Sequence, residues 1–312
     1  MNRSQLMLQL RSSLWQAIPL PGRGQTATRH NLLMGIGRRD LSLARLAEAH
    51  WDAVAILADA GREPEPNTVY GVWASEIPGS GVELFHAGDA FRMSGTKMFC
   101  SGAKLVDHAL VTVAKPEQRL VDIDLRPHDE TICFDESGWK TQAFSETSTA
   151  TVEFRDTRVS AEGIIGLLPG FYLDRPGFWH GACGPAACWA GGAAGLVDFA
   201  CRQTRSDPHT MAHLAAMQSS VWALQAFLET AGQAIDRDPD DRARAQIRAL
   251  TVRHLVEQAC SEILTRFARA YGPYPLVMHE DVARRRQELD LYLRQSHAER
   301  DLETLGRLSR QT

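Results

Sequence analysis

The chain has 312 residues, of which 44% are hydrophobic and 23% are charged, and its formal net charge at pH 7 is −4. This composition is ordinary for a globular protein with one large domain or two to three smaller ones. The slightly negative charge and the lack of a basic block argue against nucleic-acid binding as the main activity. No run approaches the roughly 20 apolar residues that cross a bilayer, so we expect no membrane span.

The six cysteines are scattered along the chain and form no Cys-x-x-Cys pair. The first 20 residues contain a short apolar element, interrupted by Arg11, and lack the continuous hydrophobic region of a secretion signal. We therefore expect a reduced, cytoplasmic protein with buried thiols. Cys183 and Cys188 lie near His180, but small residues surround them, which favours packing over metal ligation, and no metal site is predicted.

The first part of the chain, residues 1–68, is predicted to be a short helical segment. One helix within residues 1–23 ends at a Pro-Leu-Pro-Gly sequence. A second helix begins after Asp40, a suitable N-cap, and stops at Gly61. The sequence Arg-Glu-Pro-Glu-Pro-Asn at residues 62–67 indicates a linker.

The middle part, residues 69–168, has the period of two that is typical of β-strands. Its short strands are separated by turn signals such as Glu136-Ser-Gly138, which indicates an antiparallel β-barrel or sandwich. The expected strands are residues 69–73, 82–86, 91–93, 97–101, 109–114, 120–124, 131–134 and 149–154.

The last part, residues 169–312, is rich in alanine and leucine and is predicted to form a four-helix bundle. The four expected helices are residues 174–205, 209–236, 240–271 and 279–308. Several glycines in the first of these helices cost helix propensity, but they allow a neighbouring backbone to approach closely. The fold class that follows is α+β multidomain: a short N-terminal helical segment, an antiparallel β-barrel and a C-terminal bundle.

One motif in the middle part points to a ligand. A polar, glycine-containing turn at residues 74–81 leads into a strand, and a later strand carries Phe99 and Ser101. Alternation places these two side chains on one face, with an aromatic plane beside a hydroxyl. Such a face suits a flat heteroaromatic ring such as a flavin, whereas an amphipathic β-meander without a ligand is the alternative explanation.

These segments and strings resemble the acyl-CoA dehydrogenase superfamily, whose members are flavoproteins with a helical, a β-barrel and a four-helix domain. Ser75-Glu76-x-Pro-Gly-Ser80 is similar to the family's Thr-Glu-Pro-Gly-x-Gly-Ser loop. Lys97-Met-Phe-Cys-Ser101 is similar to the Lys-x-Trp-Ile-Thr string that contacts the flavin. The resemblance implies FAD as the cofactor, with Ser75, Ser80, Phe99 and Ser101 among the residues that bind it.

The resemblance continues into the helical part and covers residues 65–312 in all, while the N-terminal segment is shorter than the family's domain. Arg269-Ala-Tyr-Gly-Pro-Tyr274 resembles a Gly-Gly turn that helps to bind the FAD of a neighbouring subunit, which implies a role for Gly272. The family's Arg-x-x-Phe-Gly string, which holds the FAD diphosphate, is missing. Arg205 or Arg202 stands near its place.

The position of the family's catalytic glutamate is occupied by Gln295. An amide is not basic, so Gln295 cannot remove the α-proton of a thioester, as a buried carboxylate does. One branch of the family places its base at the position of Asp174, although a helix cap is an alternative role for that residue. His297 is a second candidate base, or else a partly exposed helix residue.

The resemblance implies an FAD-dependent oxidoreductase that performs α,β-dehydrogenation of the CH–CH group of an acyl thioester. The electron acceptor is then an electron-transfer flavoprotein or oxygen, and a homodimer or homotetramer is expected. Two alternatives remain open: a flavin-dependent monooxygenase on the same scaffold, and a non-catalytic relative that has lost FAD.

Overall fold

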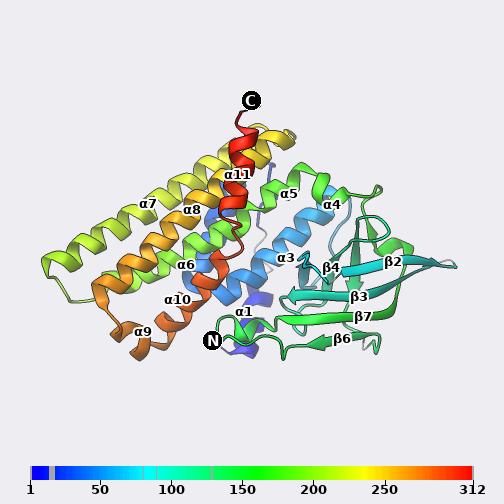
Figure 1. Cartoon of the computed structure of the whole chain (residues 1–312), viewed down its shortest axis with the longest axis horizontal. Helices are drawn as coiled ribbons and strands as arrows, with labels where there is room; N and C mark the ends of the chain where they lie inside the picture. Colours follow the sequence, from blue (N-terminus) through cyan, green and yellow to red (C-terminus); the bar gives the residue numbers. More distant parts are fainter. Residues whose placement is uncertain (1, 14–17, 80, 89, 128, 311–312) are drawn as a thin grey trace. The chain divides into compact units, whose positions relative to one another are not determined.

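The chain folds into two compact units, each assembled from segments that are distant in the sequence (Figure 1). One unit comprises Met1–Ala17 and Ala49–Phe178, and the other comprises Ile18–Glu48 and Trp179–Thr312. The division into three domains that the sequence suggests stays a prediction. This computed structural model describes residues 2–13, 18–79, 81–88, 90–127 and 129–310.

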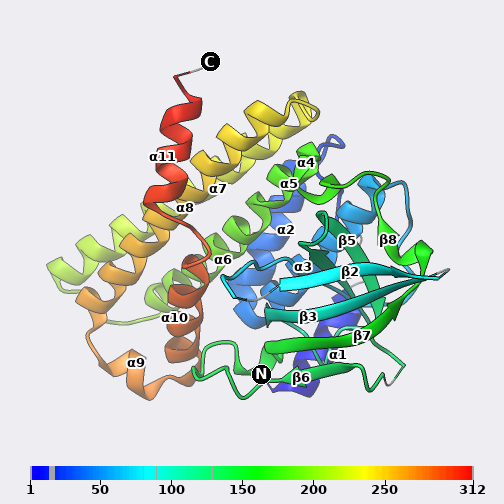
Figure 2. The same cartoon turned by 45° about the vertical axis from the view of Figure 1, so that its right-hand side comes forward.

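The first unit contains two four-stranded sheets. One has the order β1-β4-β5-β8, with β1 parallel to β4 and its other pairs antiparallel. The other has the order β2-β3-β7-β6 and is antiparallel throughout (Figure 2). The strands are β1 (Tyr70–Trp73), β2 (Gly81–Ala87), β3 (Ala90–Cys100), β4 (His108–Val113), β5 (Arg119–Asp124), β6 (Ile132–Asp135), β7 (Ala150–Val159) and β8 (Ile164–Ile165).

The antiparallel barrel expected from the sequence is replaced by these two separate sheets. Among the described strands, β8 pairs with β5 and β6 pairs with β7, and no ladder joins β6 to β8. The strands at one edge of each sheet are short: β8 has two residues and β6 has four. A closed barrel needs a continuous ladder around the sheet, which such short edges do not provide.

Strand β3 joins two predicted strands, residues 91–93 and 97–101, which the sequence predicts to be separated at residues 94–96. Gly95 has a φ of +128° and faces the neighbouring strand β2. A Cβ atom at this position would lie 2.1 Å from the carbonyl oxygen of Gly81, so glycine is needed for the two backbones to pass. The register between β3 and β7 shifts between Met93 and Gly95, and the strand continues through the irregularity.

The core of the first unit lies between a helix and the sheet that contains β4 and β5. Helix α3 (Leu41–Asp59) contributes its last turns to this unit, and α4 (Phe171–Asp174) follows β8. Their apolar side chains pack against side chains of the strands and exclude water from one face of the sheet. The cluster consists of Ala53, Ile56, Leu57, Tyr70, Leu110, Leu120, Ile165 and Tyr172.

The second unit is helical. Helices α7 and α8 form an antiparallel hairpin and lie side by side in both views (Figures 1 and 2). No described helix combines the length and the apolar character that crossing a membrane requires. Besides the first turns of α3, the helices are α2 (Thr26–Arg39), α6 (Cys183–Cys201), α7 (Pro208–Arg237), α8 (Arg242–Tyr271), α9 (Tyr274–Met278), α10 (Glu280–Leu293) and α11 (Glu299–Leu308).

Two of the four expected bundle helices are shorter than predicted. The helix expected at 174–205 begins only at Cys183, because α4 ends before Pro176 and a separate short helix, α5 (Pro176–Gly181), follows. The helix expected at 279–308 is broken between α10 and α11, where Ala298 has a φ of +46°. The predicted N-cap at Asp40 is confirmed, since its Oδ1 accepts a hydrogen bond of 2.9 Å from the amide of Leu43.

Helix α2, which the sequence analysis did not predict, packs tightly against α6. A Cβ atom on Gly191 would lie 2.1 Å from the carbonyl oxygen of Met34, and one on Gly37 would lie 2.5 Å from that of Cys188. The two backbones therefore approach each other more closely than any side chain would allow. This confirms the prediction that the small residues of this segment permit close helix packing.

Candidate functional site

The end of strand β3 presents an aromatic side chain on an unusual backbone. Phe99 is 53% exposed and has a φ of +59°, in the left-handed region that non-glycine residues seldom adopt. The register with β7 shifts between Lys97 and Cys100, which marks a β-bulge. Backbone strain of this kind persists only where the surroundings impose it, and it is concentrated at functional sites.

The bulge also changes the relation of Phe99 to Ser101. Strand β3 ends at Cys100, and Ser101 lies in the turn that follows, so the regular alternation predicted for these two residues does not hold. The carbonyl oxygen of Ser101 accepts a hydrogen bond of 3.0 Å from the indole of Trp73. Its hydroxyl accepts one of 3.3 Å from Thr149. These contacts fix Ser101 in the turn that follows the strand.

The loop after β1 is attached to the same strand end. The Ser75 hydroxyl donates a hydrogen bond to the carbonyl oxygen of Met98, the residue before Phe99. Glu76 accepts a hydrogen bond of 2.6 Å from Lys97 Nζ. Ser80, the remaining residue that the resemblance places at the cofactor, lies outside the described residues.

A second aromatic side chain reaches this end of the sheet from a distant loop. The rings of Phe99 and Trp139 have centroids 6.3 Å apart and meet edge to face at 84°. The Trp139 indole is held by a hydrogen bond of 2.9 Å to the carbonyl oxygen of Ala143. We refer to Ser75, Phe99, Ser101 and Trp139 as the β3-end cluster. An exposed aromatic plane with hydroxyl-bearing residues at the same strand end fits a flat heteroaromatic ring.

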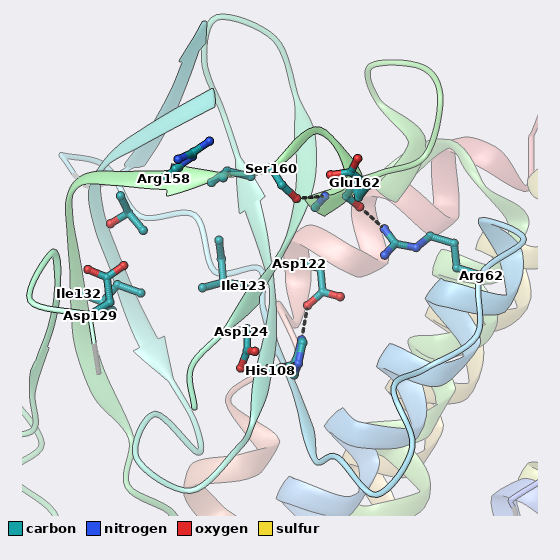
Figure 3. A pocket seen from close by; sticks show the side chains of 13 residues that line it. Arg62, His108, Asp122, Ile123, Asp124, Asp129, Ile132, Arg158, Ser160 and Glu162 are labelled. Carbon is teal, nitrogen blue, oxygen red and sulfur yellow. Dashed lines mark hydrogen bonds and ion pairs between the residues drawn. The ribbon is translucent and has the colours of Figure 1, made fainter. Parts of the chain in front are cut away.

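A pocket of about 320 Å³ lies elsewhere in the first unit, between the two sheets (Figure 3). Strands of both sheets and the segment after β7 contribute to its wall. Most of its lining residues are polar, and they include residues of both charge signs. The residues are Arg62, His108, Asp122, Ile123, Asp124, Asp129, Ile132, Thr157, Arg158, Val159, Ser160, Glu162 and Gly163.

His108 lies among three acidic side chains at this wall, those of Glu65, Asp122 and Asp124. Its Nδ1 lies 2.9 Å from Asp122 Oδ1, and its Nε2 lies 2.9 Å from Glu65 Oε2. Burial alone would lower the pKa of His108, but the hydrogen bond and charge of Asp122, together with the charge of Asp124, raise that pKa above its ordinary value.

Most charged groups of this pocket are already paired. Figure 3 shows His108 directed at Asp122, and Arg62 directed at Glu162, whose carbonyl oxygen lies 2.6 Å from Arg62 Nη1. The interactions around the pocket therefore form a network that connects the linker at residues 62–67 to the strands. This network was not predicted from the sequence, although two acidic residues, Asp122 and Asp124, lie two positions apart on β5 and indicate a polar strand face.

The second unit has a smaller pocket of about 180 Å³ near the end of α8. It brings together two regions that the resemblance connects with FAD, because Arg205 lies in its wall beside the turn at residues 271–275. Gly272 terminates α8 with a φ of +65°. The lining consists of Phe199, Gln203, Thr204, Arg205, Tyr271, Tyr274, Pro275 and His279.

The charge of Arg205 is already balanced in part. Its Nε lies 2.7 Å from Asp207 Oδ2, the residue that caps α7. Hydrogen bonds from Thr210 and Arg205 lower the pKa of Asp207, so the carboxylate is charged at neutral pH. An anion bound at Arg205 would have to compete with this carboxylate. The roles assigned to Arg205 and Gly272 stay predictions.

The three candidates for a catalytic base lie in different surroundings. Asp174 is exposed at the end of α4, and it does not cap the long helix that follows, because α6 begins at Cys183. Gln295 is exposed in the break between α10 and α11, where its carbonyl oxygen accepts a hydrogen bond of 2.7 Å from Arg253. His297 lies in the same break, with Nδ1 3.3 Å from Asp301 Oδ1.

All six cysteines are described and are free thiols. Burial raises the pKa of Cys100 to about 12 and that of Cys183 to about 11, so neither is a reactive thiolate at neutral pH. Cys201 is exposed, which corrects the expectation that the thiols are buried. Within the described ranges, no three His, Cys, Asp or Glu side chains converge as metal ligands.

Solved structures share this fold over nearly the whole chain. Methanesulfinate monooxygenase MsuC from Pseudomonas fluorescens has a TM-score of 0.78 at 16% identity, covering 99% of this chain and 89% of that chain. The FMN-bound structure of TdsC from Paenibacillus sp. A11-2 has a TM-score of 0.79 at 14% identity, covering 97% and 95%. The chain has the acyl-CoA dehydrogenase-like fold of these enzymes.

A nitrososynthase from Micromonospora carbonacea var. africana gives a similar result, with a TM-score of 0.77 at 16% identity and coverage of 96% of this chain and 86% of that chain. No protein-family model and no curated protein matches the sequence. Identities this low establish the fold alone. The function therefore has to be argued from the residues of this chain.

Proposed function

We propose that this protein is a flavin-dependent monooxygenase that acts on a small molecule and binds its flavin at the β3-end cluster. The observation that carries the flavin assignment is the exposed, strained Phe99, which the bulge presents at the strand end that the resemblance assigns to the cofactor. The fold shared with FMN-bound TdsC supports it. Phe99 and Trp139 offer apolar contact to the ring, and the hydroxyls of Ser75 and Ser101 belong to the segments that meet at the same strand end.

Monooxygenation is favoured over dehydrogenation by the side chain at residue 295. Dehydrogenation of a thioester needs a base for the α-proton, and the amide of Gln295 cannot serve. Asp174, the alternative carboxylate, is exposed at the end of a four-residue helix and is not enclosed by the apolar surroundings of a buried catalytic base. A reduced flavin supplies the electrons that activate oxygen, so this chemistry needs no such carboxylate.

The role left to the protein is to hold the flavin and the organic substrate and to limit the access of water. Oxygen is then the acceptor, in place of an electron-transfer flavoprotein. FAD is the cofactor implied by the sequence resemblance, whereas TdsC contains FMN in its solved structure. Both flavins belong in the test, and a homodimer or homotetramer in a cytoplasmic setting stays part of the proposal.

Titration of the purified protein with FMN and with FAD tests the first step. We expect saturable binding of at least one of them, with flavin absorbance at about 450 nm retained by the protein after gel filtration. A preparation that remains colourless with either flavin in excess would instead support the non-catalytic alternative. Supplying reduced flavin and following oxygen consumption with candidate sulfur- and nitrogen-containing substrates then tests the reaction class.

Acyl thioester dehydrogenation remains the second candidate, because Asp174 occupies the position of a base in one branch of the resembling family. Anaerobic mixing of the flavin-loaded protein with a panel of acyl-CoA thioesters measures it directly. Bleaching that disappears in the Asp174→Asn variant would favour the dehydrogenase over the monooxygenase. We expect no bleaching in either protein.

A further inference from the structure

Strand β3 carries a charge that is almost completely removed from water. Lys97 is 1% exposed and precedes Phe99 by two residues. We propose that Lys97 is a positioning residue that fixes the bulge and thereby holds Phe99 in the conformation that meets the flavin. The part of the inference that concerns flavin binding rests on the proposed function. The stabilisation of the bulge by Lys97 is a property of the flavin-free protein.

The Lys97 ammonium is the centre of a triangle of hydrogen bonds. Its Nζ lies 2.6 Å from Glu76 Oε1 and 2.7 Å from Thr112 Oγ1, and the Thr112 hydroxyl lies 2.9 Å from the same carboxylate oxygen. The three residues come from β3, from the loop after β1 and from β4. A buried ammonium is tolerated only with such partners, so it strongly favours the arrangement that supplies them.

These contacts lie immediately before the bulge. Ser75 and Glu76 bind Met98 and Lys97 respectively, so two adjacent loop residues are fastened to two adjacent strand residues. On the other side of the bulge, Cys100 is paired again with β7 and fully buried. With both ends held, Phe99 is left in the left-handed conformation that turns its ring outward.

The structure provides a second lysine–glutamate pair that is not connected to the bulge at Phe99. Lys115 and Glu83 join the chain after β4 to β2, with Nζ 3.0 Å from Oε1. Both side chains are exposed, 72% for Lys115 and 54% for Glu83, and neither adjoins the bulge. Exposed pairs of this kind contribute little to stability. The Glu83→Gln variant therefore serves as the control for Glu76→Gln.

The test compares Lys97→Met, Glu76→Gln, the double variant and Glu83→Gln. Amide hydrogen exchange of residues 97–103 is measured without flavin, and the FMN dissociation constant by quenching of flavin fluorescence, at a temperature where every variant is folded. We expect faster exchange of this segment and a dissociation constant raised about tenfold in Lys97→Met and Glu76→Gln. The double variant should bind FMN no more weakly than Lys97→Met, because each single substitution already removes the same Lys97–Glu76 interaction.

Exchange of residues 97–103 that matches the wild type, or an FMN affinity within about twofold of it, would overturn the proposal. So would additive losses in the double variant, or a loss of protection spread evenly over the first unit, since both point to general destabilisation. If Lys97→Met does not fold, Glu76→Gln carries the comparison alone. If the wild type binds neither FMN nor FAD, the proposed function fails, and hydrogen exchange still decides whether Lys97 holds the bulge.

Discussion

The imidazole Nδ1 of His108 lies 2.9 Å from Oδ1 of Asp122, which joins the first residue of β4 to the middle of β5. The pKa of His108 is raised in the folded protein because the pull of Asp122 and Asp124 outweighs the effect of burial. The protonated imidazole is thus stabilised by folding. Its contribution is fully present below the unfolded-state pKa of about 6.5 and is lost as the pH rises through the higher folded-state pKa.

The first prediction follows from the raised pKa of His108 in the folded protein. Between a mildly acidic and a mildly alkaline buffer, the wild type should lose more unfolding free energy than His108→Gln, because only the wild type has this proton to release. Urea denaturation at both pH values, followed by circular dichroism, measures the difference. His86→Gln, at an exposed histidine of β2, is the control. Parallel pH profiles for wild type and His108→Gln would contradict the prediction.

A histidine in the second unit gives the opposite pH dependence. Burial lowers the pKa of His30 to about 4, and its Nδ1 lies 2.9 Å from the carbonyl oxygen of Leu228. The neutral imidazole is therefore favoured by folding, and its contribution is lost as the pH falls through the unfolded-state value. We expect a loss of about 3 kcal/mol between pH 7 and pH 4 that is reduced in His30→Gln. Equal acid sensitivity of the two proteins in chemical denaturation would count against it.

The contact between α2 and α6 makes glycine necessary at residue 191. Gly191→Ala should destabilise the protein by about 3 kcal/mol, because the added methyl group meets backbone that cannot rotate away. Gly35→Ala, in α2, has nothing within 4 Å of its added Cβ atom and should be neutral or stabilise by about 0.5–1 kcal/mol. Unfolding midpoints of the two variants provide the measurement, and similar midpoints would refute the proposed close approach.

The β3-end cluster predicts a selective loss of flavin binding. Phe99→Ala should raise the flavin dissociation constant about tenfold, since the aromatic contact to the ring is removed. Phe85→Ala removes another exposed phenylalanine from the same sheet, at β2, and should leave the affinity unchanged. Both constants come from fluorescence titration with FMN and FAD. Equal effects of the two substitutions would place the flavin elsewhere.

Much of the fold follows from local sequence patterns. The period of two located most strands to within a residue or two, and Asp40 acts as the N-cap that its side chain predicts. The glycines of α6 predicted that a neighbouring backbone approaches this helix closely. These features depend on residues that are near one another in the sequence, which is why the sequence predicts them.

The remaining features depend on distant residues. Helix α2 contains two glycines and a weak apolar pattern, and it is stabilised by packing against α6 rather than by its own propensity. The bulge at Phe99 and the pairing of His108 with Asp122 involve strands that meet only after folding. Arg205 and the turn after α8 converge for the same reason. Strand alternation and helical periodicity carry no information on tertiary contacts between residues that are distant in the sequence.

The interleaving of the chain between its two units has a consequence for its synthesis on the ribosome. Residues 18–48 belong with segments that begin at residue 179, so they emerge long before the helices that cover them. Until then, the apolar face of α2 stays uncovered and available to chaperones or to aggregation. A nascent chain arrested near residue 178 should therefore complete the strand-rich unit, yet keep this early stretch sensitive to proteases.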